Sequence, residues 1–220
     1  MGYSMKFDAV IFDCDGVLVD SEAITTGVLR EMLEELGWPL SHQECHALFV
    51  GKAVQDELAI IQQRTGRKPG QGWIDEFRIR RNSALSLNLE AVPGIHEALS
   101  RISPYWRSSI ACASAADRGK ISLQLDKVGL LGYFEDRMFS GYEVARNKPF
   151  PDVYLAAAKA LDVAAQRCAI VEDSVTGVSA GVAAGAMVFA YSPLGHDETL
   201  FQAGASAVFT DMAALPDLLM

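Results

Sequence analysis

The pattern of apolar and polar positions divides the chain into three stretches. Residues 7–12 form a short, largely apolar run with β-branched side chains, which predicts a buried strand. From Ser21 to about residue 90 the apolar positions recur every three or four residues, as in amphipathic helices, and Gly37 ends the first of them. After a Val-Pro-Gly break at residues 92–94, short apolar runs alternate with helical periods. The chain therefore changes from helical to alternating structure at that break.

The two kinds of period predict a definite series of elements. A capping-box signature, Ser41 followed by Glu44, marks the start of the second helix. Helices are expected at residues 21–36, 41–49, 54–63, 73–85, 95–102, 120–128, 152–161 and 175–184. Strands are expected at residues 7–12, 109–113, 138–139, 169–171, 187–191 and 207–209. Because the later strands alternate with helices, we expect a parallel sheet with helices on both faces.

One connection is too long for a simple α/β unit. The first strand ends at Asp13 and the next begins near Ser108, over 90 residues later, whereas a β-α-β crossover takes about 30 residues. An inserted helical domain accounts for the excess. We therefore expect an α/β fold, with a Rossmann-like core of residues 1–19 and 93–220 and an α-helical domain of residues 20–92. Ligands of such open sheets bind at the carboxyl ends of the strands.

Composition narrows the class of partner. The 220 residues are 50% hydrophobic and 21% charged, as in an ordinary globular protein, and the net charge is −9. Nucleic-acid binding needs a basic field, so we expect no nucleic-acid partner, although a metal ion can still bring in a small anion.

The four cysteines lack Cys-x-x-Cys spacing, and no run of about 20 apolar residues or signal peptide is present. We expect a cytoplasmic, monomeric protein that does not bind membranes.

The acidic pair Asp13-x-Asp15, with Gly16 behind it, follows the first strand. A carboxylate there can attack a phosphoryl group and form an aspartyl-phosphate. A second carboxyl group two residues later can protonate the leaving oxygen and then activate water. The alternative is an ordinary turn, because Asp and Gly both favour turns.

Two further positions could bind an anion. Ser114 ends the strand at residues 109–113 and could donate a hydrogen bond to a phosphate oxygen, or it could simply cap the next helix. Lys148 precedes Pro149, which restricts the backbone before it. That position suits a fixed positive charge, and the alternative is a solvated surface lysine.

Glu172 and Asp173 follow the apolar run at residues 169–171. Two acids at the end of a buried strand repel each other and are costly without a cation. Magnesium prefers carboxylate oxygens, water and substrate phosphate, a set that Asp13 and Asp173 could complete. The alternative is that Asp173 caps the following helix.

In this order, the four places match the motif set of the haloacid dehalogenase-like superfamily, and the chain resembles the phosphatase branch of that family. Residues 13–21 match the first motif, Ser114 the second and Lys148 the third, and Glu172 to Ser174 with Gly177 match the fourth. The resemblance spans residues 7 to about 192. The helical insertion matches the small cap domain of the family.

The resemblance implies a role for each position. Asp13 would be the nucleophile, and Asp15 the general acid and base, which also gives its backbone carbonyl to Mg²⁺. Asp173, supported by Glu172, would complete the metal site. The phosphate would be held by Ser114, the adjoining Ala115 and Lys148. The second acid, Asp15, separates the chain from dehalogenases, which lack it, and so points to phosphoryl transfer.

Within the family the chain is similar both to β-phosphoglucomutases and to small phosphosugar phosphatases with the same cap. The mutases carry a histidine where this chain has Thr25, and cations where it has Val50 and Val54. Hydrolysis is therefore the simpler fate of the aspartyl-phosphate, and mutase activity is the alternative. The stretches at residues 20–22, 139–142 and 146–149 look most like bacterial phosphatases that act on 6-phosphogluconate and related phosphosugars.

Substrate selection is expected in the cap. Candidate contacts are Glu22, Lys52, Arg78 and Arg81, and the alternative for the two arginines is a solvated helix face.

Two other classes of protein are alternatives to the phosphatase. A receiver-like phosphoacceptor module also uses an acidic metal site and a lysine, but it has no long helical insertion after its first strand. A catalytically dead binding module would not need both Asp13 and Asp15.

Overall fold

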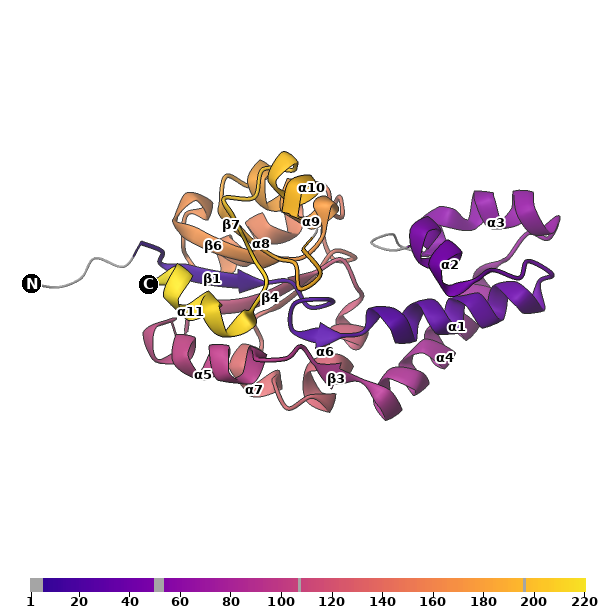
Figure 1. Cartoon of the computed structure of the whole chain (residues 1–220), viewed down its shortest axis with the longest axis horizontal. Coiled ribbons are helices and arrows are strands. Elements are labelled where there is room, and N and C mark those ends of the chain that lie inside the picture. The colour runs from indigo at the N-terminus through magenta and orange to yellow at the C-terminus, as the bar shows by residue number, and fades with distance from the viewer. Residues whose placement is uncertain (1–5, 50–53, 107, 196) are drawn as a thin grey trace, which may run out of the picture. The chain divides into compact units, whose positions relative to one another are not determined.

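The structure is a computed structural model that describes residues 6–49, 54–106, 108–195 and 197–220. The chain divides into two compact units (Figure 1). The larger unit contains residues 1–19 and 91–220, and the smaller one contains residues 20–90. No helix in the described part of the chain is long and apolar enough to cross a membrane.

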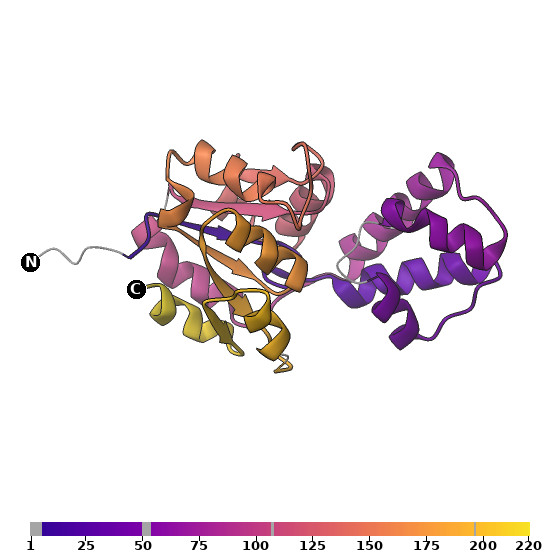
Figure 2. The same cartoon turned by 90° about the horizontal axis from the view of Figure 1, so that it is seen from above.

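The described residues of the larger unit form a six-stranded sheet with the order β5-β4-β1-β6-β7-β8. Figure 2 shows strands of this sheet beside the indigo β1, with helices around them. Every neighbouring pair is parallel. All six predicted strands are confirmed: β1 (Ala9–Phe12), β4 (Ile110–Ser114), β5 (Met138–Ser140), β6 (Cys168–Glu172), β7 (Met187–Tyr191) and β8 (Ala207–Phe209). Because both faces of a parallel sheet are covered, its central strands are continuous apolar runs, and every residue of β1 is fully buried.

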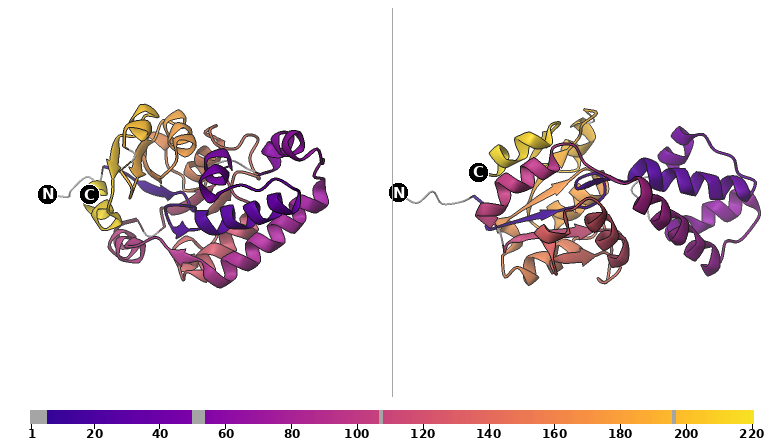
Figure 3. Two further views of the ribbon diagram at one scale, coloured as in Figure 1. Left: turned by 45° about the vertical axis from the view of Figure 1, so that its right-hand side comes forward. Right: turned by 90° about the horizontal axis from the view of Figure 1, so that it is seen from below.

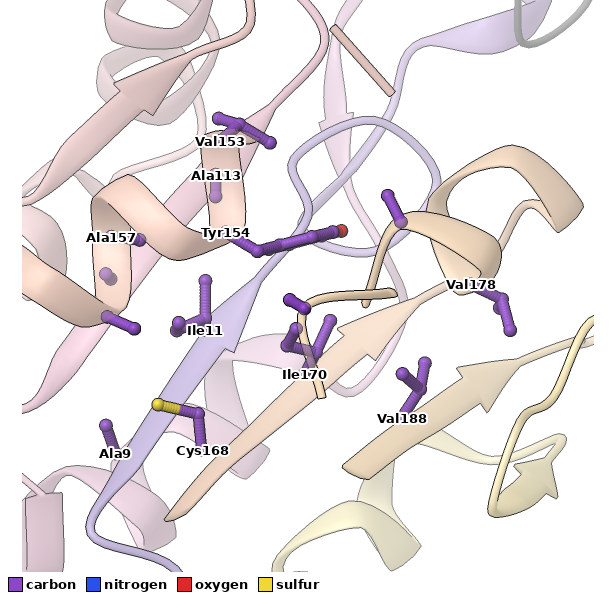
Figure 4. Close-up of a cluster of buried hydrophobic side chains, with 14 of the residues drawn as sticks. Ala9, Ile11, Ala113, Val153, Tyr154, Ala157, Cys168, Ile170, Val178 and Val188 are labelled. Carbon is purple, nitrogen blue, oxygen red and sulfur yellow. The ribbon is translucent and has the colours of Figure 1, made fainter. Parts of the chain in front are cut away.

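Helices cover both faces of this sheet. On one face, Ile11 of β1 and Ile170 of β6 pack with Tyr154 and Val178 of two helices (Figure 4). On the other face, the Phe12 ring meets the Phe134 ring at a centroid distance of 6.1 Å. The helices are α5 (Ile95–Trp106), α6 (Arg118–Lys127), α7 (Leu131–Phe134), α8 (Asp152–Ala160), α9 (Val175–Ala183), α10 (Asp197–Gln202) and α11 (Leu215–Leu219). The expected α/β fold, a Rossmann-like core with parallel strands, is therefore observed.

The smaller unit is helical (Figure 3). The predicted capping box begins its second helix, because the Ser41 N–H donates to Glu44 Oε2 at 2.8 Å and the Glu44 N–H donates to Ser41 Oγ at 3.2 Å. Its helices are α1 (Glu22–Glu35), α2 (His42–Phe49), α3 (Leu58–Thr65) and α4 (Gln71–Asn88). They share one apolar core built from Leu29, Met32, Leu33, Cys45, Phe49, Ile61 and Phe77.

The sequence pattern missed the shortest elements. Two-residue strands, β2 (Val19–Asp20) and β3 (Glu90–Ala91), pair with each other where the chain leaves and re-enters the larger unit. The helices α7, α10 and α11 were also not predicted. A two-residue strand shows no alternation, and a helix of four to six residues is too short to display the helical period.

Candidate active site

The residues predicted to take part in catalysis, phosphate binding and metal binding lie at one edge of the sheet. Asp13 directly follows β1, Ser114 ends β4 and Glu172 ends β6, and these three strands are neighbours. Lys148 lies between β5 and α8. Parallel strands bring their carboxyl ends to the same edge, so residues far apart in sequence become neighbours there.

Lys148 bridges two of the acids. Its Nζ donates to Asp13 Oδ1 and to Glu172 Oε1, both at 2.8 Å, and its side chain is only 4% exposed. The alternative of a solvated surface lysine is therefore wrong. The amine also lies 4.6 Å from the centre of the Tyr154 ring, whose hydroxyl donates to Glu172 Oε1 at 2.9 Å. Tyr154 was not singled out in the sequence, where it resembles one more apolar position of α8.

Glu172 joins Lys148 to the turn that starts α9. Its Oε2 accepts the N–H groups of Asp173 at 2.8 Å and Ser174 at 2.9 Å. Burial opposes its ionisation, but Lys148 and these hydrogen bonds keep the pKa of Glu172 below its ordinary value. A Cβ atom at Gly177 would lie 1.6 Å from Glu172 Oε1, so only glycine fits there. The residue that caps α9 is Ser174, whose Oγ accepts the Gly177 N–H at 3.0 Å, and the alternative of Asp173 as the cap is wrong.

Three carboxylates form a group that can hold a cation. Asp13, Glu172 and Asp173 each offer an oxygen, and these oxygens lie within 4.8 Å of one another. The turn at Gly16, with φ of +77°, comes so close that a Cβ atom there would lie 1.8 Å from Asp173 Oδ2. A set of hard oxygen donors fits Mg²⁺. Both oxygens of Glu172 accept hydrogen bonds from the protein, which fixes that carboxylate beside Asp13 and Asp173.

Asp15 is held by two residues that sequence reasoning missed. Lys120 Nζ and Gln124 Nε2, both from α6, donate to Asp15 Oδ1 at 2.7 and 2.8 Å. The two side chains stand four residues apart and lie on the buried side of the helix, next to Ile121. One signal was present in the sequence. Two polar residues, four positions apart, lie on the side of α6 that otherwise buries apolar side chains.

Ser114 and Ala115 lie beside the site in different environments. Ser114 is 1% exposed, and its Oγ accepts the N–H of Ala116 at 3.1 Å. The cap of α6 is Asp117, so the alternative of Ser114 as a helix cap is wrong. Ala115 is exposed, and its carbonyl accepts from Asn147 Nδ2 at 3.0 Å, which ties this loop to the one that carries Lys148.

The candidate residues of the smaller unit have other partners. Glu22 Oε1 lies 3.2 Å from His46 Nε2, and Arg78 pairs with Asp75 at 3.3 Å. Arg81 is only 8% exposed and its guanidinium lies 5.8 Å from the Phe77 ring, so the interpretation of a solvated helix face is wrong for this arginine. Lys52 and the adjacent residues 50 and 51 lie outside the described residues. The role of all these residues toward a substrate stays a prediction.

The electrostatics of the site make the charge on Asp13 costly in the metal-free protein. Burial raises the pKa of Asp13 to about 7, from an ordinary value of 3.8, and the neighbouring Glu172 and Asp15 raise it further while Lys148 lowers it. A raised carboxyl pKa stabilises the fold below the pKa of the unfolded chain, and this contribution is lost as the pH rises through the folded pKa.

A pH series therefore tests the environment of Asp13. In the presence of a chelator, we expect Asp13→Asn to gain stability over the wild type as the pH rises from 4 to 8, by up to about 4 kcal/mol in the free energy of unfolding. The measurement is urea unfolding of both proteins at several pH values. A difference that stays constant, or shrinks, over this range would show that Asp13 is already ionised at low pH.

The sequence of the chain matches a known protein family. A model described as haloacid dehalogenase-like hydrolase matches residues 7–185. The chain is 31% identical over 214 residues to the 6-phosphogluconate phosphatase of Escherichia coli (strain K12), covering 97% of this chain and 95% of that protein. It is 29% identical to the phosphorylated carbohydrates phosphatase of Thermotoga maritima, covering 91% and 93%.

Solved structures share the fold over almost the whole chain. A hydrolase of the same family from Deinococcus radiodurans R1, with bound phosphate and sodium, is 33% identical and has a TM-score of 0.77 over 99% of each chain. A putative β-phosphoglucomutase from Thermotoga maritima is 26% identical and has a TM-score of 0.79, covering 97% of this chain and 100% of that one.

Proposed function

The chain belongs to the haloacid dehalogenase-like hydrolases and is a phosphatase, and we propose that it hydrolyses phosphorylated sugars or sugar acids through a phosphorylated Asp13. The observation that carries this proposal is the group of charges around Asp13. Lys148 Nζ lies 2.8 Å from the Asp13 carboxylate, and Asp15, which could transfer a proton, follows two residues later. The match to the family model includes the helical insertion, which sets aside the alternative of a receiver-like module.

The reaction takes two displacements at phosphorus. In the first, a carboxylate oxygen of Asp13 forms a bond to phosphorus, the bond to the leaving oxygen breaks, and Asp15 gives its proton to that oxygen. In the second, Asp15 takes a proton from water as the water oxygen attacks phosphorus, and the bond from Asp13 to phosphorus breaks. The products are the alcohol and inorganic phosphate, and Asp13 and Asp15 return to their starting states.

Cations at the site stabilise the negative phosphoryl oxygens. Lys148, already fixed between Asp13 and Glu172, holds one oxygen of the phosphoryl group. Ser114, the last residue of β4, and Ala115, which follows it, lie beside the site. We propose that Asp13 and Asp173, with the backbone carbonyl of Asp15 and support from Glu172, bind Mg²⁺, which offsets charge on the transferring group when it is bound.

The proposed substrate class rests on the relatives. Two of them are named for phosphatase activity on 6-phosphogluconate and on phosphorylated carbohydrates, and a third was solved with bound phosphate. We propose that the helical unit acts as a cap and that Glu22 and Lys52 contact the substrate. We also propose a monomer in the cytoplasm, where the four cysteines, all free and buried, would stay reduced.

Mutase activity is the second candidate, because a putative β-phosphoglucomutase shares the fold. Against it stands Thr25, which occupies the position of the mutase histidine and has no side chain able to serve as a base. Within the described residues its Oγ1 is buried without a hydrogen-bond partner. With threonine at the position of the mutase histidine and valine at the positions of both mutase cations, hydrolysis is the simpler outcome.

A metabolite screen tests the proposed function. Phosphorylated sugars and sugar acids, including 6-phosphogluconate, are incubated with the protein and Mg²⁺, and released phosphate is measured. We expect turnover of several members of this class, and loss of at least about 100-fold when a chelator removes the metal. Efficient interconversion of β-glucose 1-phosphate and glucose 6-phosphate would instead establish the mutase. Full activity in the chelator would contradict the proposed Mg²⁺ site.

A further inference from the structure

Helix α6 presents two hydrogen-bond donors to the carboxylate of Asp15. Lys120 Nζ lies 2.7 Å and Gln124 Nε2 lies 2.8 Å from the same oxygen, Oδ1. The Lys120 side chain is 9% exposed and Gln124 is fully buried, whereas the Asp15 side chain is 31% exposed. The donors therefore lie inside the protein, and the carboxylate that they bind is partly exposed to solvent.

The position of Lys120 is unfavourable for the helix that carries it. Lys120 lies in the first turn of α6, and its backbone N–H is bound by the capping Asp117 at 2.9 Å. A cation at a helix N-terminus opposes the helix dipole, and burial of an ammonium group is costly unless it is paired. Neither helix formation nor packing explains a lysine here, but the ion pair with Asp15 does.

Gln124 is oriented by a second contact. Its Oε1 accepts a hydrogen bond from Cys14 Sγ at 3.6 Å, and Cys14 lies between the two site acids in the chain. With Oε1 turned toward Cys14, the amide nitrogen faces Asp15. Lys120 and Gln124, four residues apart, stand on the same face of α6, so one helix holds the carboxylate with two donors.

We propose that Lys120 and Gln124 are positioning residues that hold the Asp15 carboxylate in the orientation needed for proton transfer to the leaving oxygen and from water. This inference rests on the proposed role of Asp15 as general acid and base. Both side chains donate to Asp15 and not to a phosphate in the proposed reaction. They act on the rate of the chemical steps through Asp15, and leave substrate binding to the other residues of the site.

Two consequences distinguish positioning from a structural role. A misplaced catalytic group lowers the rate of chemistry, by up to about 100-fold for a shift near 1 Å, while binding persists. The loss also depends on the leaving group, because a stable leaving anion departs without protonation and a basic one does not. Phenyl phosphate and p-nitrophenyl phosphate, which have similar shapes, provide this contrast.

The experiment compares Lys120→Met and Gln124→Leu with the wild type in Mg²⁺. Lys127→Met is the matched control, because it removes an exposed lysine from the same helix. For Lys120→Met we expect kcat on phenyl phosphate to fall about 10- to 100-fold, with KM within about two-fold. The loss of kcat/KM on p-nitrophenyl phosphate should be clearly smaller. Gln124→Leu should show the same pattern more weakly, and Lys127→Met should match the wild type.

Each outcome decides the inference. Equal losses of kcat/KM on both substrates, a raised KM with unchanged kcat, or a gain in kcat would overturn it. If thermal melting shows that Lys120→Met does not fold, Gln124→Leu carries the test with the same criteria. Asp15→Asn is measured alongside: normal turnover by that variant overturns the proposed function itself, whereas a large loss there with an unaffected Lys120→Met overturns only the positioning role.

Discussion

An Asp13→Asn variant should lose at least about 1,000-fold of the wild-type kcat on p-nitrophenyl phosphate in Mg²⁺. The amide cannot supply the anionic oxygen that attacks phosphorus. Asp13 is the carboxylate that directly follows β1, and it lies 2.8 Å from Lys148 Nζ. The substitution keeps the size of the side chain, and Lys148 keeps its second partner, Glu172, at 2.8 Å. We therefore expect loss of turnover in a folded protein.

The matched control for this variant is Asp8→Asn. Asp8 precedes β1 at the opposite end of the same strand, where it pairs with Arg167 at 2.7 Å and both side chains are about half exposed. An exposed pair contributes little to stability, and its loss should leave turnover within about two-fold of the wild type. Near-normal hydrolysis by Asp13→Asn would refute the nucleophile assignment.

A covalent readout adds a second line of test. When the wild-type protein is quenched in acid during turnover, mass spectrometry should find a phosphoryl group on the peptide that contains Asp13. The Asp13→Asn variant should carry none. A phosphoryl group on another residue, or none in the wild type under conditions where the second step is slow, would contradict the two-displacement reaction.

The second large effect is expected for Asp15→Asn, with kcat falling about 100- to 10,000-fold on phosphate esters of simple alcohols. The amide can neither protonate the leaving oxygen nor take a proton from water. The two roles separate with p-nitrophenyl phosphate, because p-nitrophenolate leaves without a proton but water still needs a base. Phosphorylation of Asp13 then outpaces its hydrolysis.

A burst is the expected result of this imbalance. In a stopped-flow experiment, Asp15→Asn should release about one equivalent of p-nitrophenolate per protein rapidly and then turn over slowly. The same protein with phenyl phosphate should show no burst, because its leaving group needs the missing proton. Slow, linear release of p-nitrophenolate from the first turnover would show instead that Asp15 is needed mainly before the chemical steps, for example to complete the metal site.

The strands and the order of the site motifs could be predicted because their signals are local. A short apolar run with β-branched side chains, such as residues 9–12, is typical of a strand buried on both faces, and all four of these residues are fully buried. The chain direction then brings the residues at the end of each run, such as Asp13 and Glu172, to one edge of the sheet. Length alone indicated that residues between the first two strands form a separate insertion.

The partners of each site residue could not be predicted in this way. Lys148 and Asp13 are 135 residues apart in the chain, and Lys120 and Asp15 are 105 apart, yet each pair meets within 3 Å. In the sequence, Lys148 is a candidate phosphate-binding residue with no assigned carboxylate partner, and Lys120 is one polar residue in a helix. Their burial depends on how α6 and the loop after β5 dock on the sheet, which no local period encodes.

The sequence by itself therefore determined the fold class, the insertion and the acids at the strand ends, because hydrophobic period and chain length are properties of contiguous residues. Only the tertiary structure decided which cation serves which acid: Lys148 joins Asp13 to Glu172, and Lys120 with Gln124 holds Asp15. The physical reason is that a buried charge must find a partner within hydrogen-bonding distance, and packing of distant segments selects that partner.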